Sequence, residues 1–263
     1  MHEPSRIPHR SITNISIQKM TAIYGLIGKK LGHSFSKSYF TEKFHSEHID
    51  AIFENFELEE INGFTSLLAS HPQLRGLSVT IPYKEAIVPY LDVLSPNAQA
   101  IGAVNCIAFR DGLTVGHNTD VIGFRESLAE VYEAAPGGKA LILGTGGAAK
   151  AVEFALQHYF EFDAIELASR EPQGEREVGY DTLAIGSYRL VVNTTPLGMH
   201  PNLEGCPEID FERLDPGCFV FDLIYNPEET KLLAAARARG CQTRNGLDML
   251  MRQADASWEI WGV

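Results

Sequence analysis

The fold of this chain is decided by Leu141-Ile142-Leu143-Gly144-Thr145-Gly146-Gly147-Ala148-Ala149, in which an apolar run, a glycine-rich turn and an alanine-rich segment follow one another. This is the order of a β-strand, a tight turn and the N-terminus of a helix. Gly144 permits the turn, Gly146 lets backbone amides approach a pyrophosphate, and Ala149 allows close helix–strand packing. The helix N-terminus presents partial positive charge to the phosphates. The motif therefore predicts a dinucleotide-binding βαβ unit, and the alternative is a glycine-rich turn that binds no ligand.

The end of the next predicted strand bears on which dinucleotide is bound. NAD-binding proteins place an acidic residue there, about 20 residues after the glycines, but this strand ends at Ser169 and Arg170. A hydroxyl and a guanidinium suit a 2′-phosphate, which favours NADP. Glu171 and Glu175 follow closely, so NAD stays possible, and a third interpretation is that Arg170 only pairs with Glu171 or with solvent.

Short apolar runs alternate with helical patterns along most of the chain. We expect strands at 22–27, 51–56, 74–81, 103–109, 139–143, 164–168, 188–193 and 218–223. We expect helices at 36–48, 62–69, 119–132, 148–159, 230–239 and 247–261. This rhythm predicts an α/β protein whose sheets are parallel or mostly parallel, with helices on their faces.

A boundary near residue 119 divides the pattern into two α/β domains with a cleft between them. The first domain is expected to hold residues 20–118 and 245–263, and the second residues 119–244. The helix at 247–261 is followed by no further strand, so we expect it to pack back on the first domain. Residues 1–19 are polar and basic, without the apolar core of a secretory signal, and are expected to be a disordered extension or a tag.

Composition limits the class of partner. Lys and Arg number 22 against 34 Asp and Glu, which gives a net charge of −12. Such a surface repels phosphate backbones and anionic lipids, so we expect no nucleic acid or membrane partner. The cysteines are scattered and form no CxxC pair, which is typical of reduced thiols in a cytoplasmic protein. The histidines show no metal-ligand spacing, and we expect no metal.

Eight short segments, taken in order, resemble the shikimate dehydrogenase family. They are GHSFS (32–36), SVTIPYK (78–84), GAVN (102–105), GHNTD (116–120), GTGGAA (144–149), NTTPLGM (193–199), YNP (225–227) with Thr230, and GLDML (246–250) with Gln253. Each segment alone is weak evidence, but the ordered set is specific and covers nearly all of the chain from residue 21.

The resemblance implies an N-terminal substrate domain, a Rossmann-like NADP-binding domain and a C-terminal helix that returns to the first domain. It also implies an oxidoreductase that reversibly reduces 3-dehydroshikimate to shikimate with NADPH, in the biosynthesis of chorismate and the aromatic amino acids. One alternative is a quinate/shikimate dehydrogenase that uses NAD. Another is a non-catalytic regulator that binds shikimate, although the presence of both Lys84 and Asp120 argues against it. The partners are then small molecules, and the chain is a monomer or a homodimer.

Two residues are implied to carry the chemistry. Reduction of a ketone leaves an oxyanion that needs a proton, so a positioned acid is required. The resemblance assigns this role to Lys84, after the turn at Pro82, and pairs it with Asp120 at a helix start. Asp120 would hold the ammonium and bind a substrate hydroxyl. The alternatives are a solvated lysine and a helix-capping acid, although Asn118 or Thr119 would serve equally as the cap.

The remaining implied site residues bind the substrate and the cofactor. Ser34 and Ser36 would bind the substrate carboxylate, or else cap the helix that starts at residue 36. Thr80, Asn105, Tyr225 and Gln253 would bind the ring hydroxyls. A polyol needs several such polar partners, because each buried polar group left without a hydrogen bond costs about 1–3 kcal/mol. The cofactor contacts would be Gly144, Thr145, Gly146, Gly147, Ala148, Ser169 and Arg170, with Thr194, Leu223 and Gly246 on the nicotinamide side.

Overall fold

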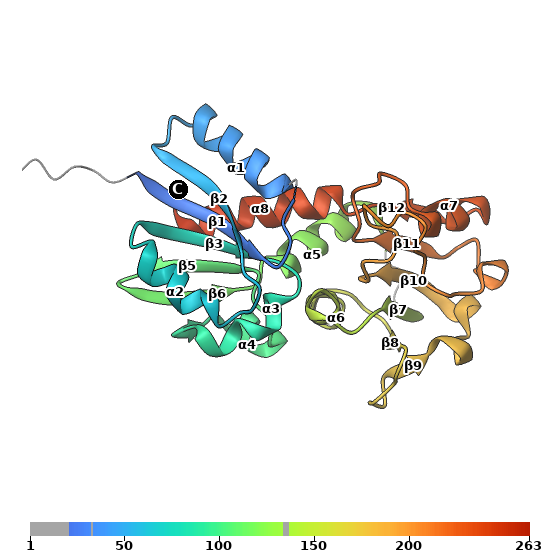
Figure 1. The fold of residues 1–263 in the computed structure, drawn as a ribbon. Coiled ribbons are helices and arrows are strands. Elements are labelled where there is room, and N and C mark those ends of the chain that lie inside the picture. The colour runs from blue at the N-terminus through green and yellow to red at the C-terminus, as the bar shows by residue number, and fades with distance from the viewer. Residues whose placement is uncertain (1–20, 33, 134–136) are drawn as a thin grey trace, which may run out of the picture.

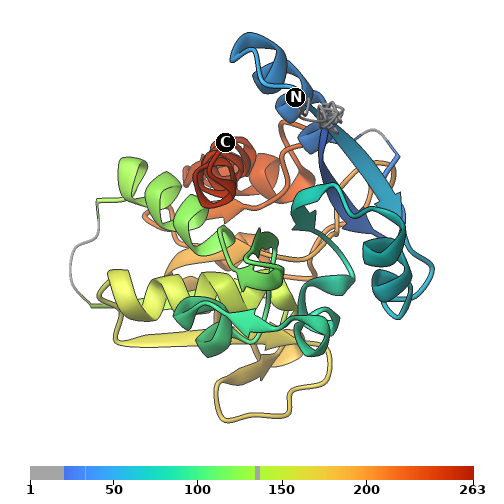
Figure 2. The same cartoon turned by 90° about the vertical axis from the view of Figure 1, so that its left-hand side faces the viewer.

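The structure is a computed structural model that describes residues 21–32, 34–133 and 137–263. These residues form two six-stranded sheets, each in its own lobe and each covered by helices (Figures 1 and 2). The expected α/β class with two lobes is confirmed. The expected extension at 1–19 lies outside the described residues. Among the residues that the structure describes, no helix is long and apolar enough to cross a membrane, and no cluster of His, Cys, Asp or Glu is placed to hold a metal ion.

The sheet of the first lobe has the strand order β2-β1-β3-β5-β6-β4. Its strands are β1 (Ala22–Gly28), β2 (Ala51–Glu57), β3 (Leu74–Val79), β4 (Val93–Leu94), β5 (Cys106–Arg110) and β6 (Leu113–His117). β1 pairs in parallel with β2 and β3, as the alternation of strands and helices predicted, and β4 pairs in parallel with β6. β5 runs antiparallel to both of its neighbours, so this sheet is mixed.

The antiparallel part is a hairpin that the apolar pattern did not predict. Asp111 and Gly112 join β5 to β6 with φ values of 52° and 81°, and two positive φ values are typical of a tight type I′ turn. β5 also starts later than the expected strand at 103–109. Val104 N–H donates to the carbonyl of Lys84 at 2.7 Å, so at this residue the chain bonds to the turn after β3 and has not yet joined the sheet.

Helices cover both faces of the first sheet, because successive strand residues point to opposite faces and apolar side chains lie on each face. On one face α1 (Phe35–Ser46) and α8 (Leu247–Trp261) pack against Tyr24 and Leu26 of β1. On the other face lie α2 (Gly63–Ser70), α3 (Tyr83–Ala86), η1 (Val88–Tyr90) and α4 (Pro96–Ile101). Ile23 and Ile27 of β1 point into that second layer.

The C-terminal helix returns to the first lobe, as expected. Trp261 at its end is buried, and its indole N–H donates to the carbonyl of Ile107 at 3.1 Å. Its ring lies 5.0 Å from that of Phe40 and 5.2 Å from that of Tyr24. Gly76 makes room for this contact, because a Cβ there would lie 2.5 Å from the indole nitrogen. Figure 1 shows α8 running from the second lobe to the first.

The sheet of the second lobe has the order β12-β11-β10-β7-β8-β9, and its described pairs are parallel. Its strands are β7 (Lys139–Leu143), β8 (Ala164–Ser169), β9 (Glu177–Gly179), β10 (Tyr188–Asn193), β11 (Phe219–Asp222) and β12 (Gln242–Arg244). α5 (Asp120–Val131) and α6 (Gly147–Tyr159) cover one face. The other face is covered by α7 (Lys231–Ala238) and by η2 (Tyr180–Thr182), η3 (Ile185–Ser187) and η4 (Phe211–Arg213).

Candidate active site

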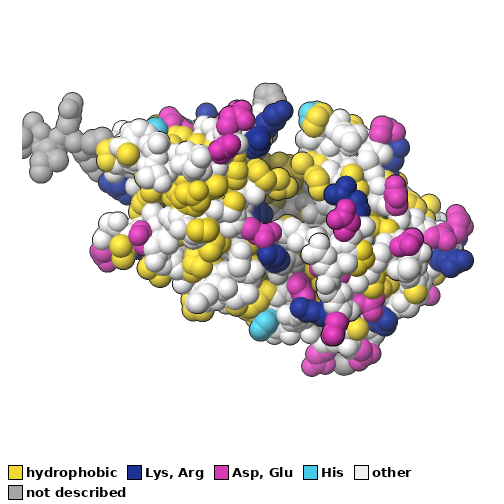
Figure 3. Space-filling view, turned by 60° about the horizontal axis from the view of Figure 1, so that its bottom comes forward, with side chains coloured by type: hydrophobic (Ala, Val, Ile, Leu, Met, Phe, Trp, Pro, Cys, Tyr) yellow, Lys and Arg dark blue, Asp and Glu magenta, His cyan; other side chains and the backbone are white. Residues whose placement is uncertain are grey.

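The first lobe approaches the second where Lys84 faces Gly147, and the molecular surface is hollowed between the two lobes (Figure 3). On the side of the first lobe, the chain leaves β3 at Val79 and enters α3 through a cis peptide bond at Ile81–Pro82. The hydroxyl of Tyr83 donates to the carbonyl of Leu58 at 2.5 Å and fixes the start of that helix. Lys84 lies in this short helix, α3, on the side that faces Gly147 of the second lobe.

Lys84 and Asp120 form an ion pair, although 36 residues separate them in the sequence. The Nζ of Lys84 lies 2.6 Å from Oδ2 of Asp120, and the two side chains are 16% and 7% exposed. Asp120 is the first residue of α5, where the helix dipole favours a carboxylate. The interpretation of Lys84 as a solvated surface lysine is therefore wrong, and Asp120 turns its carboxylate to Lys84 and Asn105.

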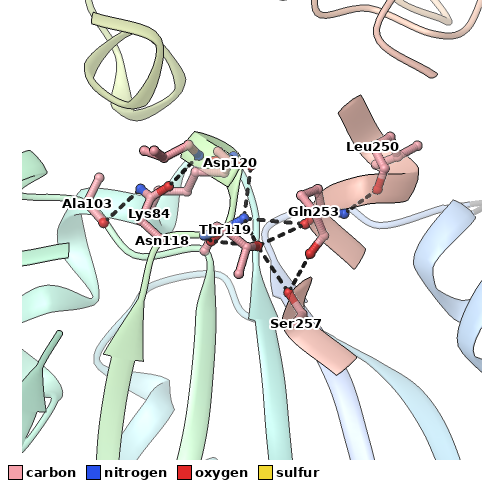
Figure 4. A network of polar contacts seen from close by, with 10 residues as sticks. Lys84, Ala103, Asn118, Thr119, Asp120, Leu250, Gln253 and Ser257 are labelled. Carbon is pink, nitrogen blue, oxygen red and sulfur yellow. Dashed lines mark hydrogen bonds and ion pairs between the residues drawn. The ribbon is translucent and has the colours of Figure 1, made fainter. Parts of the chain in front are cut away.

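A polar network extends from Asp120 to α8 (Figure 4). The side-chain amide of Asn105 donates to Oδ1 of Asp120 at 2.9 Å and lies 3.4 Å from Oε1 of Gln253. Gln253 in turn donates to the carbonyl of Leu250 at 2.8 Å. The structure thus gathers Lys84, Asp120, Asn105 and Gln253 from distant segments of the sequence.

The expected carboxylate ligands lie at the N-terminus of α1. Ser34 is the N-cap of this helix, and its hydroxyl oxygen accepts from the backbone N–H of Lys37 at 3.3 Å. The capping interpretation therefore holds for Ser34, and α1 begins at Phe35, one residue before the expected start. Ser36, in the first turn, is half-buried. The Ser34 hydroxyl keeps its proton for a second partner, because the cap uses only a lone pair.

Tyr225 reaches the same place from the second lobe. It follows β11, and its ring meets the ring of Phe35 edge-on at 5.8 Å. Burial raises the pKa of Tyr225 further above neutral pH, so its hydroxyl stays protonated and able to donate. Thr80, the other expected hydroxyl ligand, is half-buried and follows β3, held by its N–H bond to the carbonyl of Ile27 at 2.9 Å.

The glycine-rich turn forms the facing wall of the cleft. Gly144 has a φ of +105°, which strongly favours glycine, and a Cβ there would lie 3.0 Å from the hydroxyl of Thr194. At Gly146, the N-cap of α6, an added Cβ would meet no atom of the described residues within 4 Å. This open backbone at a helix N-terminus fits a pyrophosphate. At Gly147, by contrast, a Cβ would lie 3.1 Å from the Cβ of Lys84.

Other expected cofactor residues surround this turn. Thr145 is exposed and Ala148 is half-buried, both beside the N-terminus of α6. The hydroxyl of Thr194 donates to the carbonyl of Leu143 at 2.7 Å and closes the end of β7. Leu223 and Gly246 touch through their backbones, because a Cβ at Gly246 would lie 2.0 Å from the carbonyl oxygen of Leu223. Only glycine fits where α8 begins.

The tip of β8 is held much less tightly. Ser169 is half-buried and accepts from the N–H of Glu171 at 3.3 Å, whereas Arg170 is exposed. Among the described residues Arg170 makes no ion pair within 4.0 Å, with Glu171 or with any other acid. Arg176 is paired with Glu153 at 2.5 Å. Arg170 is therefore exposed to solvent, and its role as a phosphate ligand stays a prediction.

One polar cluster of the second lobe was missed from the sequence. Asp222, buried at the end of β11, accepts from Asn193 at 2.9 Å, from Thr230 at 2.6 Å and from the N–H of Ile224 at 3.1 Å. Burial raises the pKa of Asp222. The cluster ties the loop after β10 to the loop that carries Tyr225. Its signal in the sequence is an acid that directly follows the apolar run 219–221.

Comparison with known proteins shows which family has this arrangement of residues. A model of the shikimate dehydrogenase substrate binding domain matches residues 26–107. Shikimate dehydrogenase (NADP(+)) from Moorella thermoacetica is 38% identical over 268 residues, which cover 94% of this chain and 90% of that protein. The chain belongs to the shikimate dehydrogenase family. The resemblance seen in the ordered motifs is thereby confirmed.

Solved structures of the family share the fold. The shikimate 5-dehydrogenase of Thermus thermophilus, in complex with NADP(H) and shikimate, matches with a TM-score of 0.81 and 30% identity. The quinate dehydrogenase of Corynebacterium glutamicum, in complex with NAD, gives the same two values. Each match covers 92% of this chain and 94% of the other. Both lobes and the returning helix are therefore part of the shikimate dehydrogenase fold.

Proposed function

We propose that this protein reversibly reduces 3-dehydroshikimate to shikimate with NADPH, a step towards chorismate and the aromatic amino acids. The observation that carries the proposal is the Lys84–Asp120 ion pair, 2.6 Å long, beside the glycine turn at Gly147. The pair stands where a substrate held by the first lobe meets a cofactor held by the second. We assign residues 20–118 and 245–263 to the substrate domain, and residues 119–244 to the dinucleotide-binding domain.

Lys84 and Asp120 have different roles in the proton transfer that accompanies reduction. Bound NADPH supplies the hydride for the substrate ketone. Lys84 donates a proton from Nζ to the oxygen that becomes the hydroxyl, and takes it back in the reverse direction. Asp120 holds that ammonium through Oδ2 and offers its carboxylate as acceptor to a neighbouring hydroxyl of the substrate. Low exposure of both groups strengthens these interactions by keeping water away.

The substrate carboxylate is assigned to the N-terminus of α1. Ser34 and Ser36 donate their hydroxyl protons to it, and the first-turn backbone amides add favourable partial charge. The ring hydroxyls are assigned to neutral groups, which are Thr80, Asn105, Tyr225 and Gln253. Neutral donors and acceptors suit a polyol, because they satisfy its hydroxyls without adding buried charge.

The cofactor is assigned to the second lobe. The open backbone at Gly146 and the N-terminus of α6 fit the pyrophosphate, and the exposed guanidinium of Arg170 with the hydroxyl of Ser169 fits a 2′-phosphate. NADP is the cofactor named for the Moorella relative. A cytoplasmic location is part of this proposal, supported by the free thiols of Cys106, Cys206, Cys218 and Cys241.

The test is a steady-state assay of the purified chain with shikimate and with quinate, each with NADP+ and with NAD+. We expect turnover of shikimate with NADP+, and a kcat/KM for NADP+ at least about tenfold above that for NAD+, roughly 1.4 kcal/mol. Preference for NAD+ with turnover of quinate would instead favour the activity named for the Corynebacterium neighbour. Binding of shikimate without turnover of either substrate would contradict an enzymatic role.

A further inference from the structure

A buried threonine stands beside the catalytic pair and is used by none of the steps above. Thr119 is fully buried and occupies the N-cap position of α5, immediately before Asp120. Its side-chain hydroxyl makes no capping hydrogen bond to the helix. The oxygen lies 2.9 Å from the side-chain nitrogen of Asn105 and 3.1 Å from the hydroxyl of Ser257 on α8 (Figure 4).

The neighbours of this hydroxyl set the direction of its hydrogen bonds. Ser257 donates its only proton to the carbonyl of Gln253 at 2.8 Å, so its oxygen accepts from Thr119. Thr119 then accepts from the amide of Asn105. The longer contacts of the Thr119 oxygen, 3.2 Å to Oδ1 of Asn105 and 3.5 Å to Oε1 of Gln253, compete for the same proton. One chain of donors runs from Asn105 through Thr119 and Ser257 to the backbone of α8.

The Thr119 hydroxyl, the Asp120 carboxylate and the Thr119 backbone N–H together fix the orientation of the Asn105 amide. One amide proton goes to the Thr119 hydroxyl and the other to Oδ1 of Asp120, each at 2.9 Å. The amide oxygen accepts from the backbone N–H of Thr119 at 2.6 Å. A flipped amide would set its oxygen against the Asp120 carboxylate and its NH2 group against the Thr119 N–H, so both contacts would become repulsive.

We propose that Thr119 is a positioning residue of the reaction, with Ser257 as its support. Its hydroxyl locks the Asn105 amide, the amide holds Oδ1 of Asp120, and Oδ2 of Asp120 is thereby aimed at Lys84. The proposal rests on the proposed function. The proposal also gives α8 a part in catalysis, because the docking of this helix positions Ser257, the last donor in this series of hydrogen bonds.

The experiment compares Thr119→Val, which keeps shape and loses only the hydroxyl, with Thr119→Ser, which keeps the hydroxyl. We expect Thr119→Val to lower kcat for shikimate oxidation by on the order of tenfold, with KM for NADP+ changed less than about twofold, and Thr119→Ser to recover most of the rate. The matched control is Thr114→Val. Thr114 is also buried, and its hydroxyl bonds to Asp92 at 2.7 Å at the far end of β6. This control should unfold at a lower temperature but keep kcat.

A mutant cycle with Asn105→Ala tests whether Thr119 acts through Asn105. If it does, Thr119→Val has less than about a twofold further effect on kcat in the Asn105→Ala background. If the two substitutions lower kcat by independent factors that multiply, the proposal for Thr119 is wrong. It is also wrong if Thr119→Val leaves kcat unchanged while the wild type turns over shikimate. Either result leaves the proposed function standing. A wild type that fails to turn over shikimate would overturn the proposed function, and this proposal with it.

Discussion

The two walls of the cleft differ in how firmly their side chains are held. The substrate wall comprises Lys84, Asp120, Asn105 and Gln253, together with Ser34 and Ser36 at the start of α1. Each of the first four side chains has a protein partner, and the ion pair is nearly buried. The cofactor wall comprises Thr145, Gly146, Ser169 and Arg170. On this wall the backbone is open at Gly146 and the guanidinium of Arg170 faces solvent. Proton transfer needs a fixed geometry, whereas recognition of a phosphate needs only charge within reach. We therefore expect changes on the substrate wall to alter turnover or the KM for shikimate, and changes on the cofactor wall to alter cofactor affinity or choice.

The largest effect is expected at Lys84. Lys84→Ala removes the proton donor, and kcat should fall by about 10³, within the range typical of general acid catalysis. The dissociation constant of shikimate should stay within about tenfold, because the carboxylate and ring contacts remain. Turnover and equilibrium binding of the same preparation check both values. Wild-type turnover in this variant would remove Lys84 from the mechanism.

The next effect concerns the substrate carboxylate. Ser34→Ala with Ser36→Ala should raise KM for shikimate on the order of 100-fold, since two hydrogen bonds to a charged group are lost. KM for NADP+ should change less than about twofold. Ser95→Ala is the matched control, because Ser95 caps α4 through an equally long bond, 3.3 Å, to Ala98. A similar rise for the two ligands would point to disturbed closure of the lobes.

Gly146 and Gly147, adjacent in one turn, allow the two walls of the cleft to be compared by two similar substitutions. Gly147→Ala places a methyl group against Lys84, so kcat should fall about tenfold while KM for NADP+ is kept. Gly146→Ala places a methyl group in the open space that we assign to the pyrophosphate, so KM for NADP+ should rise about tenfold while kcat is kept. The same kinetic signature in both variants would contradict the division between the two walls.

The smallest effect is expected at the tip of β8. Arg170→Ala should erase most of an NADP+ preference of about tenfold and leave kcat/KM for NAD+ nearly unchanged. Arg176→Ala is a suitable control, because Arg176 is already paired with Glu153. If Arg170→Ala weakens both cofactors equally, Arg170 is not the phosphate ligand.

The regular elements were predicted well where apolar runs end at clear breakers. β7 and β10 and the helix α8 have the expected bounds, 139–143, 188–193 and 247–261. β9 and β12 were missed because they are short edge strands with little apolar patterning. The hairpin β5–β6 had a readable signal in Asp111-Gly112, but the buried residues before β5 resemble a strand in sequence.

Only those site residues that lie in recognisable sequence motifs could be predicted. Lys84, Asp120, Asn105 and Gln253 were named from the resemblance, and the structure brings them together. Thr119 and Ser257 were not named as site residues, because a small hydroxyl residue looks the same in sequence whether it lies at the surface or in a buried network. Their importance depends on the docking of α8 on α5, which no local pattern encodes.

The independence of the two walls is tested most directly by the cofactor preference of the Ser34→Ala, Ser36→Ala variant. The ratio of kcat/KM for NADP+ to that for NAD+ should equal the wild-type ratio within about twofold, because sites that share no contacts combine additively in free energy. The serines lie at α1 in the first lobe, whereas Arg170 lies at the tip of β8 in the second. A preference that collapses in this variant as far as in Arg170→Ala would show that the walls act as one unit, and would contradict the account.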